Sequence, residues 1–130
     1  MAAVATSAGS GMRNRMMHYA ADESFNCYLA TMKSDPKAVQ ITHHSSVSLL
    51  IYKGGSDVND SQEVEISGKA VIVKDQEERQ KALEITAKRS PVVRYLVEAG
   101  NDQVLACIKV VPDVAKFRIL RKSCRACRPQ

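Results

Sequence analysis

The sequence predicts a mainly β fold, a small antiparallel β-barrel with helical additions. Short apolar, strand-like segments alternate with short polar turns, and the predicted order of elements is β-β-β-α-β-β-α-α-β-β. Gly68 interrupts the longest predicted strand, where a small barrel needs a bulge or a sharp bend. The 130 residues suffice for one ordinary core. We expect a single domain over residues 1–120, followed by a basic, disordered tail over residues 121–130.

The first half of the chain carries most of the short predicted strands. Residues 2–6 are apolar, and a flexible turn separates them from a second strand over residues 12–20. Residues 25–32 form a third strand, rich in aromatic and β-branched strand formers. A short helix over residues 35–44 then leads to the strongly strand-like run at residues 46–53, which a polar loop follows.

The strand over residues 62–74 shows the clearest alternation in the chain. Its apolar positions recur every second residue and predict one buried face. The other face is polar at first but becomes apolar at Val71 and Val73, so we expect the far end of this strand to be buried on both sides.

Two helices and a final β segment complete the chain. The helix over residues 75–88 has Asp75 as its N-cap and Glu78 three residues later, the pattern of a capping box. The next helix has Ser90 as its cap and Gly100 as its stop. The segment from residue 101 to residue 120 predicts two strands or one bent strand, because Val111 and Pro112 interrupt its strand-like pattern.

Composition limits the function classes. With 45% hydrophobic and 25% charged residues, the chain resembles a globular protein; it contains neither an apolar run long enough to span a membrane nor a secretory signal pattern, so a cytoplasmic protein is expected. Much of the net charge of +5 comes from the last ten residues, RKSCRACRPQ. That tail could contact nucleic acid or acidic lipid, but no aromatic platform accompanies it, and a solvated terminus is the favoured interpretation.

The cysteines do not predict a metal site. Cys27 and Cys107 lie in apolar strands and are interpreted as small core residues. Cys124 and Cys127 form a single C-x-x-C pair, which lacks the second pair or the spaced histidines of a zinc site. The favoured interpretation of that pair is adventitious disulfide formation in air, and a structural or redox role is the alternative.

The segment from Tyr28 to Lys37, YLATMKSDPK, is the most informative part of the sequence for function. A predicted strand ends in this segment, and the chain then turns into a predicted helix that has Asp35 as its N-cap and Lys37 in its first turn. Unpaired backbone N–H groups, the helix dipole and a lysine together suit an anion such as a phosphate. Arg13 and Arg15 alternate on a preceding strand and would share one of its faces. The alternative is that these three cations only form solvated surface.

This ordered set of motifs resembles the FMN-binding split β-barrel family, that is, the pyridoxamine 5′-phosphate oxidase-like proteins, and in particular their small general-stress-protein branch. RNRMM lies on the second strand, YLATMKSDPK forms the strand-to-helix corner, and EVEISGKAVIV leads into the acidic helix start DQEE. The resemblance covers roughly residues 2–120.

The resemblance implies a homodimer with FMN in two equivalent clefts at its interface. It assigns Arg13, Arg15, Thr31 and Lys37 to the phosphate. It implies that two segments lie along the flavin ring. They are the backbone beside the arginines and the strand that precedes the strand-to-helix corner. The cofactor-binding residues implied are Arg13, Asn14, Arg15, Met16, Tyr28, Leu29, Ala30, Thr31 and Lys37.

The resemblance implies a flavin-dependent oxidoreductase with an unidentified small substrate. No side chain is singled out as a catalytic acid or base, because in flavin chemistry the cofactor carries the reaction. The chain lacks tryptophan, and so lacks the W-x-R ending of the true oxidases, which argues against pyridoxamine phosphate as the substrate. Three alternatives stay open: a deazaflavin or haem in place of FMN, a non-catalytic cofactor-binding or stress-response module, and a barrel without a cofactor.

Overall fold

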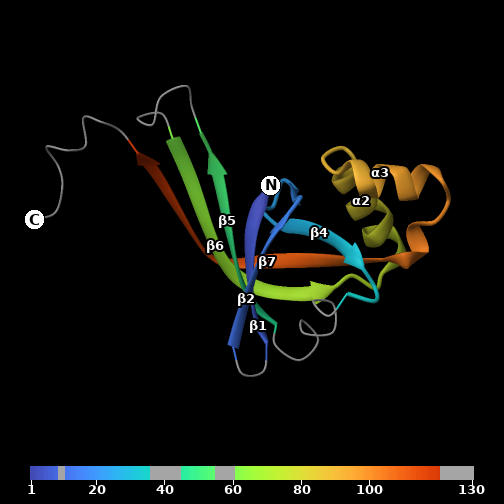
Figure 1. Ribbon diagram of the computed structural model, residues 1–130, viewed down its shortest axis with the longest axis horizontal. Helices are drawn as coiled ribbons and strands as arrows, with labels where there is room; N and C mark the ends of the chain where they lie inside the picture. The colour runs from blue at the N-terminus through green and yellow to red at the C-terminus, as the bar shows by residue number, and fades with distance from the viewer. Residues whose placement is uncertain (9–10, 36–44, 55–60, 121–130) are drawn as a thin grey trace, which may run out of the picture.

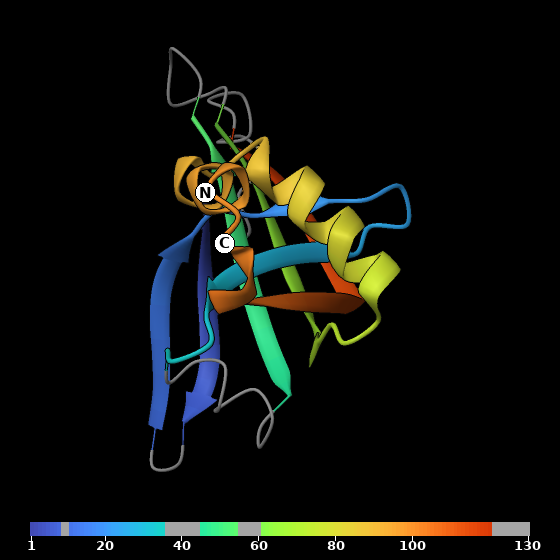
Figure 2. The same cartoon turned by 90° about the vertical axis from the view of Figure 1, so that its right-hand side faces the viewer.

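A curled antiparallel sheet with two helices packed against one end forms the described part of the protein (Figure 1, Figure 2). The computed structural model describes residues 1–8, 11–35, 45–54 and 61–120. The order of strands in the sheet is β2-β1-β5-β6-β7-β4-β3, and all neighbours are antiparallel. The sheet curls into a half-barrel, so the predicted fold class is confirmed.

The elements follow the predicted order closely. The strands are β1 (Ala2–Ala8), β2 (Gly11–Met17), β3 (Ala20–Ala21), β4 (Cys27–Met32), β5 (Ser46–Lys53), β6 (Ser61–Ile72) and β7 (Leu105–Leu120). The helices are α2 (Gln76–Ala87), α3 (Pro91–Glu98) and the short 3₁₀ helix η2 (Asp102–Val104). The predicted second strand is divided into β2 and β3, and the C-terminal segment forms one strand, β7. The predicted helix at 35–44, the loop after β5 and the tail at 121–130 fall wholly or mostly outside the described residues.

A bulge at Gly68 bends the two longest strands. Ser67 pairs with Val114, but Gly68 pairs with Pro112, so one residue of β7 is left without a partner. A Cβ atom on Gly68 would lie 2.1 Å from the carbonyl oxygen of Val111, a separation that only glycine permits. Figure 1 shows β6 and β7 changing direction together near their middles. The prediction of a bulge or bend at Gly68 is therefore confirmed.

The bent sheet has a separate apolar core on each face. The concave face encloses a barrel core, made by Ala2, Val4, Met17, Cys27, Leu29, Val47, Leu49, Ile66, Ala70, Ile108 and Val110. The helices cover the other face of β4 and of the first half of β7, and this helix core comprises Tyr28, Val73, Ala82, Leu83, Val93, Leu105 and Cys107. Consecutive residues of β4 therefore alternate between the two cores, as strand geometry requires.

One burial prediction for β6 is wrong. Val73 is buried beneath the helices, but Val71 is 48% exposed. The helix core includes Val73 and not Val71, so the cover over this face ends between them. The sequence pattern could not show where along the strand the helices stop.

The helix ends confirm most of the predicted caps. The Asp75 carboxylate accepts a hydrogen bond from the Glu78 backbone N–H at 3.0 Å. The Glu78 carboxylate, however, accepts from Lys109 Nζ at 2.9 Å and from the Tyr28 hydroxyl at 3.4 Å, which ties α2 to the sheet. Gly100 ends α3 with a φ of 74°.

We expect Gly68→Ala to lower the free energy of unfolding by about 1–3 kcal/mol, because the new methyl group overlaps backbone of β7. Urea denaturation measures the change. Gly54→Ala is the control: its Cβ would meet the flexible Tyr52 ring at 3.3 Å, and its effect should stay within about 0.5 kcal/mol. Equal stability of the two variants would contradict the account of the bend.

Stability should fall in alkaline solution because Tyr28 and Lys109, which both bond to Glu78 of α2, hold their protons more tightly when the chain is folded. Burial raises the pKa of Tyr28, and the hydrogen bond to Glu78 raises the pKa of Lys109. A raised pKa gives stability that is complete below the group's ordinary pKa and lost as the pH rises through the raised value. Urea denaturation from pH 8 to 11 should show this loss, and Lys109→Gln should reduce it more than Lys74→Gln. Identical pH profiles of the two variants would contradict it.

Candidate functional site

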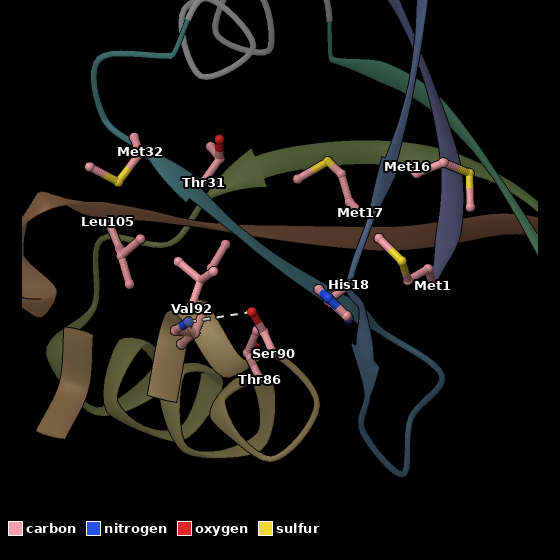
Figure 3. Close-up of a pocket in the computed structure, with 12 residues that line it drawn as sticks. Met1, Met16, Met17, His18, Thr31, Met32, Thr86, Ser90, Val92 and Leu105 are labelled. Carbon is pink, nitrogen blue, oxygen red and sulfur yellow. Dashed lines mark hydrogen bonds between the residues drawn. The ribbon is translucent and has the colours of Figure 1, made fainter. Parts of the chain in front are cut away.

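A cavity of about 240 Å³ lies where the half-barrel stays open (Figure 3). Its lining comes from the chain start, the ends of β2 and β4, the α2–α3 junction and the start of β7. The lining residues are Met1, Met16, Met17, His18, Ala30, Thr31, Met32, Thr86, Ser90, Val92, Val93 and Leu105.

The cavity lies beside unpaired strand edges. β2 is the last strand of the sheet on one side. Near the opposite end of the sheet, β4 pairs along its whole length with β7 on one of its edges. On its other edge, β4 pairs with β3 only at Cys27 and Tyr28. Within the described sheet, residues 29–32 thus present one edge without a strand partner. Backbone N–H and C=O groups on such an edge are suited to bind the polar rim of a planar ligand.

The walls of the cavity are mostly apolar, with His18 and three hydroxyl side chains among them. Met16 and Val92 stand at its rim with 62% and 64% of their surfaces exposed, and Met32 is 43% exposed. Deeper in, Thr86 and Ser90 are 2% and 4% exposed. No lysine, arginine, aspartate or glutamate lines the cavity among the residues described. Such walls favour a neutral, flat group over a charged one.

Three of the predicted cofactor-binding residues line this cavity. They are Met16, Ala30 and Thr31. Leu29 points instead into the barrel core and is 2% exposed. Tyr28 is buried in the helix core, where its hydroxyl contacts Asp22 and Glu78, so its ring packs and does not face the cavity.

The predicted cations of β2 lie along the strand that leads to the cavity. Backbone register pairs Arg13 with Thr6 and Arg15 with Val4. The Arg15 side chain is exposed, as is that of Asn14. The side chain of Arg13 and the whole of Lys37 lie outside the described residues, so the convergence of the three cations stays a prediction.

The predicted strand-to-helix corner is described as far as Asp35. The Thr31 hydroxyl donates to the Asp35 carboxylate at 3.3 Å, and the Asp35 backbone N–H donates to the Met32 carbonyl at 2.9 Å. This turn follows the end of β4, where one edge of the strand has no strand partner within the described sheet. It fixes Thr31 at the cavity wall, where the structure shows its side chain (Figure 3).

The described residues offer little for nucleophilic or metal chemistry. Cys27 and Cys107 are free thiols at 1% and 2% exposure, and burial raises the pKa of both. Their prediction as core residues is confirmed. The described chain contains no group of three or more histidine, cysteine, aspartate or glutamate side chains that could hold a metal ion.

Several cavity residues could not be found from the sequence. They are Met1, His18, Thr86, Ser90, Val92, Val93 and Leu105. Ser90 carried a signal, but only as a helix cap. The others meet at the cavity because α2 and α3 pack against β4 and the start of β7, which brings the helix junction near the end of β2, and no local pattern records that packing.

Comparison with known proteins supports the fold. No family model and no curated protein matches the sequence. Among solved structures, a Listeria innocua protein provisionally named as a pyridoxamine 5′-phosphate oxidase has a TM-score of 0.66 and 24% identity, covering 93% of this chain and 88% of its own. General Stress Protein 26 from Bacillus anthracis has a TM-score of 0.64 and 20% identity, covering 92% and 87%. An FAD-binding protein from Mycobacterium smegmatis has a TM-score of 0.68 and 13% identity, covering 92% and 86%.

This chain has the split β-barrel fold of the pyridoxamine 5′-phosphate oxidase-like proteins. The fold implied by the sequence resemblance is thereby confirmed, including its likeness to a general stress protein. None of the described helices has the length and apolar character that crossing a bilayer requires.

The burial of the two strand cysteines predicts that they do not react in the folded state. In a Cys124→Ser/Cys127→Ser variant, a thiol reagent such as Ellman's reagent should label no cysteine under native conditions and both in urea, because only unfolding exposes Cys27 and Cys107. Fast labelling of either thiol in the native protein would contradict the assignment of both residues to closed cores.

Proposed function

We propose that this protein binds FMN, with the flavin ring in the cavity between β2 and β4. The observation that supports this best is the cavity's construction. Its walls are mostly apolar, with no lysine, arginine, aspartate or glutamate among the described residues, and it borders an unpaired backbone edge at Ala30 and Thr31. A flavin ring is flat and neutral and has hydrogen-bonding atoms along one side, so it matches both properties. Other proteins of this fold include one that is named as FAD-binding.

The phosphate would lie outside the apolar cavity, near the cations. FMN carries nearly two negative charges, which need charge-assisted hydrogen bonds. Arg15 lies two residues before Met17, so its Cα is about 7 Å from that of a cavity residue. Arg13 and Lys37 would complete the phosphate site. The Thr31 hydroxyl, which donates to the Asp35 carboxylate at 3.3 Å, would have to turn from Asp35 to the phosphate when FMN binds.

We further propose that the protein acts as a homodimer. A cavity of about 240 Å³ is smaller than the roughly 300–1,000 Å³ that ligand sites usually provide. Its rim is also unusually apolar for a surface, with Met16 and Val92 mostly exposed. A second copy would cover this rim and enlarge the site, so that the two clefts form at the interface.

Bound FMN would supply the electron or hydride transfer, and the protein would bind, orient and shield it. Consistent with this, the described cavity lining offers no carboxylate or thiol as a catalytic group. We therefore propose a flavin-dependent oxidoreductase with a small substrate, acting in the cytoplasm.

A non-catalytic haem- or flavin-binding module is the second candidate. A haem-binding protein from Mycobacterium smegmatis shares the fold, with a TM-score of 0.75 and 12% identity, although this chain covers only 48% of it. His18 lines the cavity and could coordinate the iron of a haem bound there. An intense absorption band near 400 nm, and no flavin bands, would identify this function.

The proposed phosphate site predicts that the double variant Arg15→Ala/Lys37→Ala loses FMN. Purified protein is mixed with FMN, desalted and examined by visible absorption. Wild type should retain about one FMN per chain, and the double variant should retain little, because two charge-assisted contacts to the phosphate are gone.

A matched control removes two exposed lysines elsewhere. Lys53→Ala/Lys74→Ala changes the net charge equally but touches neither strand edge beside the cavity, so it should retain FMN like wild type. Equal retention by both double variants would refute the phosphate assignment. Equal loss of FMN by both double variants would also refute it, because the change in net charge alone would then explain the loss.

A further inference from the structure

The strongest unexplained feature of the cavity is the hydroxyl group of Ser90. Ser90 is 4% exposed and lines the cavity at the start of α3. Its oxygen accepts a hydrogen bond from the Val93 backbone N–H at 3.3 Å, which caps the helix. Its own proton has no acceptor among the described residues. A buried hydroxyl without an acceptor is unfavourable, and such groups are commonly satisfied by a ligand or by water.

The neighbouring hydroxyl shows that this is specific to Ser90. Thr86 also lines the cavity and is 2% exposed, but its hydroxyl donates to the Ala82 carbonyl at 2.6 Å. Thr31 likewise donates to Asp35. Of these three hydroxyl groups, only Ser90 keeps a proton to donate. Figure 3 shows its oxygen directed into the space between β4 and the α2–α3 junction.

We propose that the Ser90 hydroxyl donates a hydrogen bond to the bound flavin ring and orients it. This inference rests on the proposed function. A flavin ring has carbonyl oxygens and ring nitrogens at its edge, which are acceptors for this donor. A haem ring presents hydrocarbon along most of its edge, so the same donor favours a flavin over a haem in this cavity. Ser90 is thus a binding and positioning residue that holds the ring from the helix side, opposite the unpaired edge of β4.

The test separates the ring from the phosphate by using two probes, FMN and lumiflavin, which has the same ring but no ribityl phosphate. Flavin fluorescence titrations give the two dissociation constants for wild type and three variants. Ser90→Gly removes the hydroxyl but remains an acceptable N-cap, so the fold should be kept. Ser90→Thr keeps both the cap and the donor. Lys37→Ala is the matched control for the phosphate.

We expect Ser90→Gly to raise the dissociation constants of FMN and lumiflavin by the same factor, roughly three- to tenfold, which corresponds to the loss of one hydrogen bond. Its bound flavin spectrum should shift toward that of free flavin, a change that a purely structural cap would not cause. Ser90→Thr should bind within about twofold of wild type, and Lys37→Ala should weaken only FMN.

Other outcomes separate the two proposals. Unchanged affinity and spectrum in Ser90→Gly would overturn the role of Ser90 and leave the FMN site standing, since the hydroxyl would then be satisfied by water. An equal loss in Ser90→Thr and Ser90→Gly would also overturn it, because packing would then explain the effect. Wild-type lumiflavin binding as tight as FMN binding would refute the phosphate site, and a loss of that binding in Ser90→Gly but not in Ser90→Thr would still support Ser90. No binding of either probe by wild type would overturn both.

Discussion

The close approach of two backbones at Gly68 is the constraint on which the rest of the structure depends. With a hydrogen atom in place of a side chain, β6 can lie against Val111 and Pro112, and the two longest strands bend together. The bend curls the sheet around the barrel core and leaves the opposite face of β4 and β7 to the helices. A flatter sheet would have neither a concave core nor an open side.

The open side is where function is expected. Because the sheet curls without closing, the described edges of β2 and β4 stay unpaired beside the cavity. Helices α2 and α3 shape its second wall, and the link from Glu78 to Lys109 and Tyr28 fixes α2 on the sheet. The site is therefore assembled from both layers, and its exposed apolar rim is the surface that the proposed dimer would cover.

The sequence predicted the strands, the two described helices and the bulge because these depend on local patterns: alternation, capping residues and a glycine within a strand. Of the cofactor-binding residues that the resemblance implies, Met16, Ala30 and Thr31 line the cavity, and their role stays a prediction. The sequence did not predict the exposure of Val71, or the meeting of His18 and Ser90 at one cavity. Those depend on where the helices end against the sheet, which is a tertiary property without a local signal.

The most direct test of a dimeric flavin site is sedimentation velocity of the FMN-loaded protein, followed at both protein and flavin absorption wavelengths. The account predicts one boundary at both wavelengths, with twice the 14.3 kDa mass of the chain and one flavin per chain. A flavin signal that does not sediment with the protein would contradict the cofactor site. A flavin-bearing boundary at the mass of one chain would contradict the claim that a second copy completes it.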